Sequence, residues 1–215
     1  MTNRMALSDG VELAHLPVRE RILVAAADLF YRYGIKAVGI DVIVELAGIA
    51  KTSLYRHFPS KDDLIAAYLR RQDEIFWQSW GELAQANIGL SARDRLLCAL
   101  SALAQTMDDQ AYRGCSFLNA AAELPDPGHQ GMDVVRMHKR KLRDRLRMIA
   151  ATGDFEDPDA LADAMALLID GAIGNRLVHG NDGPSRALLV TGKMLVDASP
   201  TRSKTDERVE ADGHS

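Results

Sequence analysis

Residues 41–58, DVIVELAGIAKTSLYRHF, carry the side chains best suited to binding a polyanion. A short apolar run, a glycine and a second short run are typical of a helix-turn-helix, whose second helix can enter the DNA major groove. On that second helix Leu54 and Phe58 share an inward face, whereas Thr52 and Arg56 point away. Arginine binds guanine edges or phosphate, and hydroxyl groups bind phosphate oxygens. The side chains predicted to face DNA are Lys51, Thr52, Ser53, Tyr55, Arg56 and His57.

Charge is unevenly distributed along the chain. The net charge is −4, but residues 17–61 hold seven Lys and Arg side chains against four acids, which leaves −7 on the remainder. A basic segment beside an acidic remainder favours a polyanion contact at one end of the chain. Alone this signal is weak, since an ordinary surface helix is also polar outside and such swings occur in proteins that bind nothing.

Motifs for enzyme chemistry are missing from the sequence. It has no G-x-S-x-G, Walker loop, G-x-G-x-x-G or H-E-x-x-H. Its six histidines form no close helical pair for a metal, and no cofactor is expected. A non-specific architectural DNA binder is the stronger alternative, although the acidic remainder of the chain argues against it.

Four motifs together point to a known family. An apolar helix ending in YRYG (residues 31–34) is followed by AGI (47–49), KTSLYRHF (51–58) and SKDDL (60–64). This combination resembles the TetR (tetracycline-repressor-like) family of bacterial transcriptional regulators. The resemblance implies a DNA-binding repressor that responds to a ligand, with an N-terminal helix-turn-helix head and a C-terminal bundle for ligand binding and dimerisation.

The resemblance also implies roles for the matching side chains of the head. Arg56 falls at a variable family position and is the candidate for reading bases. The other implied roles are operator contacts by Lys51, Thr52 and Ser53, and phosphate contacts by Tyr55, His57 and Lys61.

Two positions depart from the family pattern, and a third disfavours a phosphate contact. Gly39 and Ala50 stand where Ser or Thr is common in the family. Gly39 has no hydroxyl to contact phosphate, and Ala50 is a poor N-cap that costs about 1 kcal/mol against Ser. Asp41 suits the first turn of a helix but would repel a close phosphate.

Helical periodicity dominates the whole chain and predicts an all-α fold of about nine helices. Capping signals at Ser60 and Ser91, each with Asp three residues later, and Asp157 before Pro158 mark helix starts. The predicted helices cover 17–33, 41–47, 50–58, 60–86, 91–109, 115–124, 130–151, 158–179 and 184–198. The predicted regions are a flexible N-terminus (1–16), the DNA-binding head (17–60), the ligand-binding and dimerisation bundle (61–198) and a disordered tail (199–215).

Composition favours a soluble protein in a reducing compartment. The 215 residues are 47% hydrophobic and 26% charged, with no run long enough to span a bilayer and no apolar secretory signal at the start. The two cysteines, Cys98 and Cys115, form no C-x-x-C motif, and a redox role for Cys115 is not favoured. We therefore expect a cytoplasmic protein without a membrane partner.

Residues 158–179 and 184–198 are predicted to pair across the twofold axis of a homodimer, as the resemblance implies. A twofold dimer would read a palindromic operator of double-stranded DNA, with half-sites about 34–36 Å apart. The alternative is that these faces pack within one subunit. The small or apolar residues that suit an interface are Ala162, Ala164, Ala166, Gly171, Ala172, Gly174, Ala187, Leu188, Thr191, Met194 and Leu195.

Met, aromatic and a few polar residues of the bundle are candidates to line a pocket for an unidentified small, largely apolar effector. Each apolar candidate could equally be solid core, and for Asn119 and Glu123 a capping or structural role is favoured. The basic run at 136–147 is read as the solvated face of an amphipathic helix, whose apolar seam includes Val135 and Leu142. The candidate pocket residues are Phe76, Trp80, Met107, Phe117, Asn119, Glu123, Met165 and Asn175.

Overall fold

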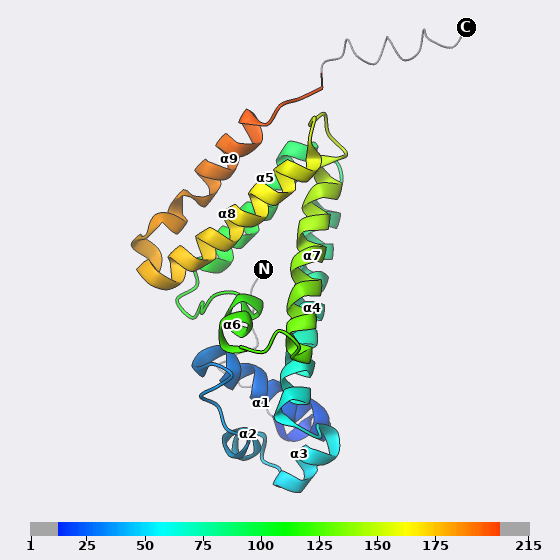
Figure 1. Ribbon diagram of the computed structural model, residues 1–215, viewed down its shortest axis with the longest axis vertical. Helices are drawn as coiled ribbons and strands as arrows, with labels where there is room; N and C mark the ends of the chain where they lie inside the picture. Colours follow the sequence, from blue (N-terminus) through cyan, green and yellow to red (C-terminus); the bar gives the residue numbers. More distant parts are fainter. Residues whose placement is uncertain (1–12, 203–215) are drawn as a thin grey trace, which may run out of the picture. The chain divides into compact units, whose positions relative to one another are not determined.

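The computed structural model describes residues 13–202, and within this range it holds α-helices, short 3₁₀ helices and no strand (Figure 1). The predicted all-α fold is confirmed. The head comprises α1 (Val18–Tyr33), α2 (Ile40–Ala47) and α3 (Lys51–His57). The later helices are α4 (Lys61–Ala86), α5 (Ala92–Met107), α6 (Ser116–Glu123), α7 (Gln130–Ala150), α8 (Pro158–His179) and α9 (Leu188–Ala198).

Helix starts coincide with the capping signals in the sequence. At α4 the Asp63 N–H donates to Ser60 Oγ over 3.0 Å, and the Ser60 hydroxyl donates back to the Asp63 carboxylate. The start of α5 repeats this arrangement. At α8 the Ala160 N–H donates to the Asp157 carboxylate over 2.9 Å. Each cap satisfies a backbone donor that the first helical turn leaves unpaired.

The described chain divides into two compact units. The first contains residues 13–81 and 111–139, so it combines the head with most of α4, all of α6 and the first half of α7. One hydrophobic core runs through it, and the Phe30 ring meets Tyr68 edge to face with centroids 5.5 Å apart. Phe117 of α6 and Val135 of α7 belong to the same core as Leu54 of α3. The predicted boundary at residue 60 is therefore not a boundary between the compact units.

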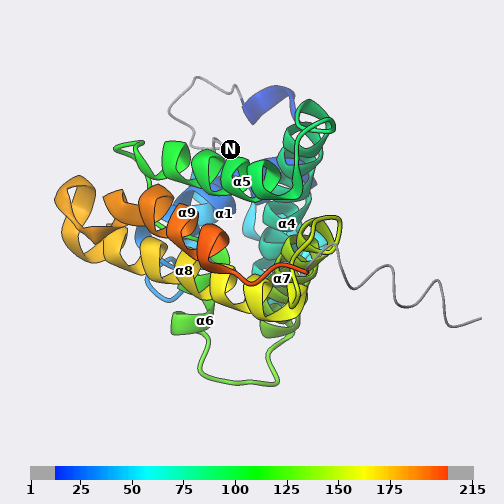
Figure 2. The same cartoon turned by 90° about the horizontal axis from the view of Figure 1, so that it is seen from above.

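The second unit contains residues 82–110 and 140–202. Within it α5, α8 and α9 pack side by side (Figure 2). Phe155 is fully buried, and the Arg93 guanidinium lies 4.9 Å from the centre of its ring. Arg143 in the second half of α7 binds Asp159 at 2.7 Å and Asp163 at 2.8 Å, so part of the basic run is engaged by acids of α8.

Both predicted flexible ends contain described residues with defined structure. Leu13–His15 forms a 3₁₀ turn before α1. The last predicted helix begins as a 3₁₀ turn, Pro184–Ala187, before α9. After α9 the chain pairs with an earlier loop, since Glu156 N–H donates to Pro200 O and Arg202 N–H to Asp154 O. The predicted disorder of the tail thus does not hold for residues 200–202, and residues 1–12 and 203–215 lie outside the described range.

Among residues 13–202, no helix combines the length and the apolar character that crossing a membrane requires.

Candidate nucleic-acid interface

The helix-turn-helix is anchored by a buried apolar face. Ile43 of α2, Leu54 of α3 and Phe58 just after α3 are each at most 3% exposed. Figure 1 shows α1, α2 and α3 gathered around the start of α4. The predicted inward orientation of Leu54 and Phe58 is confirmed, and it fixes which face of α3 remains outside.

The turn between α2 and α3 is held by a glycine and an arginine. Gly48 has a φ of 61°, in the left-handed region that favours glycine, and its N–H donates to the end of α2. Arg21 of α1 donates from Nε to Ala47 O over 3.0 Å and from Nη2 to Gly48 O over 2.7 Å. These bonds satisfy carbonyls at the end of α2 and so set the angle at which α3 leaves the turn.

The outward face of α3 is polar and positively charged. Thr52 and Arg56 are exposed on it, and the Arg56 guanidinium donates to Ser53 Oγ over 3.2 Å. Tyr55 is 43% exposed, and His57 is exposed at the end of the helix. Of the predicted DNA-facing residues of α3, only Ser53 is half-buried.

Lys51 is paired on this face with the acid of α2. Its ammonium lies 2.7 Å from the Asp41 carboxylate, and both side chains are mostly exposed. The hydrogen bond and the negative charge of Asp41 raise the pKa of Lys51, so the lysine stays protonated. An exposed pair of this kind is weak, so it does not lock Lys51 onto Asp41.

Lys61, which is predicted to contact phosphate, is hydrogen-bonded to the backbone of the head. Its ammonium donates to Ile35 O over 2.7 Å and to Val38 O over 2.6 Å, in the connection between α1 and α2. Partial burial lowers the pKa of Lys61. Two of its three donors are thus used inside the head, where they satisfy carbonyls that no helix or strand pairs.

Neither short helix has a side-chain N-cap. Gly39 before α2 and Ala50 before α3 make no capping hydrogen bond from a side chain, as their residue types predict. The N–H groups in the first turns of α2 and α3 therefore receive no side-chain acceptor from the N-cap position.

The candidate pocket residues fall into two groups. Phe76, Trp80 and Phe117 come together around His138 in the first unit: Phe76 stacks on Trp80 at 6.0 Å, and Phe117 stacks on the His138 ring at 3.6 Å. Met107 and Met165 are buried in the second unit, where Asn175 bonds to its own helix.

Asn119 and Glu123 both have partners within the first unit. The Asn119 amide donates to Arg113 O over 2.8 Å, just before α6 begins. The Glu123 carboxylate accepts a hydrogen bond from Lys36 N–H over 2.7 Å. Both side chains are therefore hydrogen-bonded to backbone groups of the same unit.

Sequence reasoning missed a buried polar pair beside the aromatic cluster. His138 is 2% exposed, and its Nδ1 lies 2.8 Å from the Asp73 carboxylate, which also accepts from Trp77 Nε1 over 2.6 Å. A signal existed, because His138 falls three residues after Val135 and four before Leu142 on the apolar seam of α7.

The geometry defines a class of protein. A short helix anchored by buried Leu54 and Phe58 displays hydroxyl, imidazole and guanidinium groups on the opposite side. That is the arrangement of a recognition helix in a helix-turn-helix DNA-binding protein.

Comparison with known proteins gives the family. Residues 22–68 match the family model of bacterial regulatory proteins, tetR family. A TetR-type transcriptional regulator from Streptomyces avermitilis, known from its crystal structure, is 32% identical in sequence to this chain. The two structures align with a TM-score of 0.77 over 87% of this chain and 100% of that chain. The HTH-type transcriptional regulator YjdC of Escherichia coli K12 is 26% identical over 164 residues, 75% of this chain and 84% of YjdC. The HTH-type transcriptional activator FasR of Mycolicibacterium smegmatis is 33% identical over 97 residues, 44% of this chain and 43% of FasR.

The chain belongs to the TetR family. It is a DNA-binding transcriptional regulator, and its family is one of regulators and not of enzymes.

Proposed function

We propose that this regulator is a homodimeric repressor that leaves a palindromic operator when a small, largely apolar ligand binds its C-terminal helical bundle. The observation that carries the proposal is the outward face of α3, which is polar and cationic while Leu54 and Phe58 are buried behind it. DNA is the partner that such a face fits, because phosphates and base edges offer acceptors to hydroxyl and guanidinium donors.

Each exposed side chain of α3 has a proposed contact. Arg56 reads a base edge, since its guanidinium is exposed and matches the paired acceptors of guanine. Thr52 and Lys51 meet the operator at the start of α3, with Lys51 exchanging Asp41 for phosphate. Tyr55 and His57 flank Arg56 and contact backbone phosphates, which orient the helix.

Dimerisation is supported by an apolar stripe on the outside of the second unit. Leu167 and Val178 of α8 are each 76% exposed, and Gly171 and Gly174 lie between them at helical spacing with open space around them. On α9, Val190 is 65% and Met194 is 66% exposed. Large exposed apolar patches mark interaction sites, and small residues allow helices to approach closely. Of the residues predicted for this interface, Ala162, Ala172 and Leu188 are instead buried within the subunit.

Effector binding is proposed at the aromatic cluster of the first unit. Phe76 and Trp80 are half-buried there, so part of each ring is open to a partner. Met107 and Met165 are fully packed and are better explained as core. A ligand releases DNA only if it prefers a conformation whose heads do not fit the operator, and a 100-fold loss of occupancy needs about 2.7 kcal/mol of coupling.

The experiment that tests the proposal is selection from a pool of random duplexes followed by fluorescence anisotropy. The full-length protein is expected to enrich a palindrome and to bind it at least about 10³-fold more tightly than a random duplex of equal length. Equal affinity for the two duplexes, with a steep salt dependence, would identify an architectural binder instead.

Effector binding has a separate test. A thermal-shift screen of hydrophobic small molecules is expected to raise the melting temperature, since a ligand at 100 times its Kd adds about 2.7 kcal/mol to stability. Trp80→Ala is expected to abolish the shift. A ligand that raises the melting temperature without lowering affinity for the palindrome would contradict effector-driven release.

An in vitro transcription assay distinguishes repression from activation. FasR, which is 33% identical to this chain over 97 residues, is named an activator, whereas we propose repression here. In vitro transcription from a promoter that contains the selected palindrome is expected to fall when the protein is added, and a rise would identify an activator.

A further inference from the structure

The connection between α1 and α2 is held by side chains from outside the head. It spans residues 34–39 and contains Ile35 and Val38, which are both 4% exposed. It has no regular secondary structure that would pair its amide and carbonyl groups. Since α2 follows it directly, the position of this connection sets the position of α2 and, through the turn at Gly48, of α3.

Glu123, the last residue of α6, binds this connection. Its Oε2 accepts the hydrogen bond from Lys36 N–H over 2.7 Å, although 87 residues separate the two in sequence. The carboxylate also fills the space beside Gly34, where an added Cβ would lie 2.9 Å from Oε1. Gly34 has a φ of 89° and ends α1, so the carboxylate sits where the chain turns toward α2.

Lys61 holds the carbonyl side of the same connection. Its two hydrogen bonds to Ile35 O and Val38 O complement the single bond that Glu123 accepts from the amide of Lys36. The negative charge of Glu123 also favours the protonated form of Lys61. One acid and one base thus fix both kinds of backbone group in this segment.

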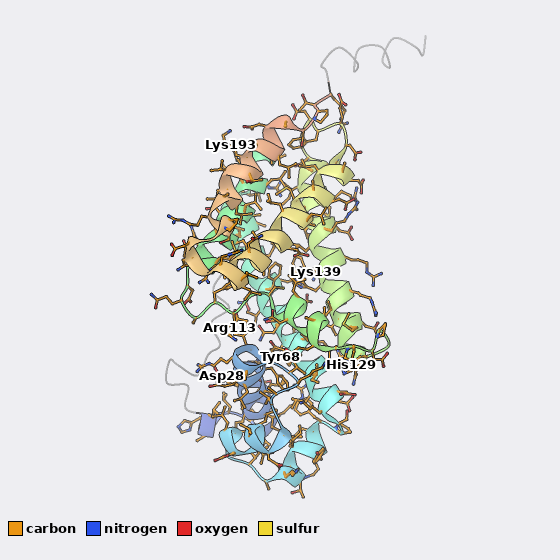
Figure 3. The ribbon with its side chains drawn as sticks, turned by 60° about the vertical axis from the view of Figure 1, so that its left-hand side comes forward. Asp28, Tyr68, Arg113, His129, Lys139 and Lys193 are labelled. Atoms are coloured by element: carbon orange, nitrogen blue, oxygen red, sulfur yellow. The ribbon has the colours of Figure 1, made fainter. Side chains whose placement is uncertain are left out.

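The other end of α6 is tied to α1. The Tyr31 hydroxyl donates to Gly114 O over 3.1 Å and accepts from Arg113 N–H over 2.9 Å. In Figure 3 the labels of Arg113, Tyr68 and Asp28 gather where the loop before α6 meets α1. Because both ends of α6 are bound, Glu123 is held at a fixed distance from Lys36.

We propose that Glu123 is a positioning residue for DNA recognition, which fixes the connection 34–39 and thereby the orientation of α2 and α3 from the end of α6. This inference rests on the proposed sequence-specific binding. A specific complex needs the recognition helix in one orientation, whereas non-specific binding depends on charge and tolerates several. Glu123 therefore sets the ratio of the two affinities.

Substitutions at Glu123 separate its geometry from its charge. Glu123→Gln keeps an acceptor oxygen at the same reach, and Glu123→Asp keeps the charge but withdraws the oxygen by one methylene. Glu123→Ala removes both. Glu74→Ala is the matched control, because Glu74 is an exposed acid on α4 in the same unit.

The full-length variants are compared on the palindrome selected by the wild-type protein and on a random duplex, by anisotropy. Glu123→Ala and Glu123→Asp are expected to bind the palindrome about fivefold to tenfold more weakly, the effect of one hydrogen bond, with random-duplex affinity unchanged within about twofold. Glu123→Gln and Glu74→Ala are expected to match the wild type on both. Hydrogen exchange of the peptide containing residues 34–39 is expected to accelerate in the Ala and Asp variants only.

Three outcomes overturn the inference. Wild-type behaviour of both Glu123→Ala and Glu123→Asp on the palindrome shows that the contact does not position α3. Equal losses on the palindrome and the random duplex, or a loss in Glu123→Gln but not in Glu123→Asp, show general destabilisation or a charge effect instead. Should the wild type itself enrich no sequence, the proposed function fails before these variants are compared, so the two failures are distinct.

Discussion

The outward face of α3 differs in chemistry from the outward faces of α8 and α9. On α3 the large apolar residues point inward and the outside carries hydroxyl, imidazole and guanidinium groups. On α8 and α9 the inward apolar residues are buried too, yet Leu167, Val178 and Val190 are exposed on the outside. A polar cationic face suits a polyanion, and an apolar face suits another apolar surface, so the two faces of one chain call for different partners.

The contrast also predicts how each surface responds to salt. The contacts proposed for α3 would release counterions from DNA and are expected to weaken as salt rises. An interface built on α8 and α9 buries apolar area, which salt screens little.

Val190→Glu is expected to have the largest effect. A charge in the apolar stripe would have to be buried without a partner, so the dimer dissociates and each monomer reads one half-site only. We expect a monomer in analytical ultracentrifugation and a loss of about 100-fold or more in affinity for the palindrome.

Met148→Glu is the matched control for this variant, since Met148 is an exposed apolar residue of α7 in the same unit. It is expected to stay dimeric and to bind as the wild type. If Val190→Glu also remains a dimer with full affinity, the stripe on α8 and α9 is not the interface.

Arg56→Ala is expected to have an intermediate effect. Loss of a guanidinium that reads a base costs about 1–3 kcal/mol, or roughly 10- to 100-fold in affinity, and relaxes the base preference at one position of each half-site. The measurement is a repeat selection with the variant. Arg70→Ala removes an exposed arginine of α4 and should leave both affinity and preference intact. Unchanged preference in Arg56→Ala would assign Arg56 to phosphate or to solvent.

Asp41→Asn is expected to have the smallest effect and the opposite sign. Without the carboxylate, Lys51 loses its partner at 2.7 Å and is free to neutralise a phosphate. Affinity for a random duplex should rise by about threefold, and the slope of log K against log salt should steepen by about 0.9. Glu45→Gln, at another exposed acid of α2, serves as the comparison. Equal slopes for Asp41→Asn and wild type would show that the pair does not restrain Lys51.

Local patterns predicted the helices and the two faces of α3. Apolar spacing and capping residues act within a few positions, so signals such as Ser60 with Asp63 identified helix starts correctly. Leu54 and Phe58 point inward as their four-residue spacing requires. The proposed DNA contacts follow from that orientation.

Contacts between segments far apart in the chain could not be predicted from these local patterns. Glu123 and Lys36 are 87 positions apart, and a backbone amide leaves no trace in residue type. Lys61 has the charge of a phosphate ligand, but its reach to Ile35 O becomes visible only when α1 and α4 pack together. The pairing of Pro200 and Arg202 with residues 154–156 is likewise made by backbone groups. The polar composition of the tail predicts disorder and gives no sign of this pairing.

Photo-crosslinking tests the central claim most directly, namely that the outward face of α3 contacts DNA. A benzoylphenylalanine placed at Thr52 is compared with one placed at Gln85, an exposed residue of α4. On the selected palindrome we predict a protein–DNA adduct from position 52 and none from position 85. Absence of an adduct at position 52 under conditions in which the duplex is fully bound would contradict this account.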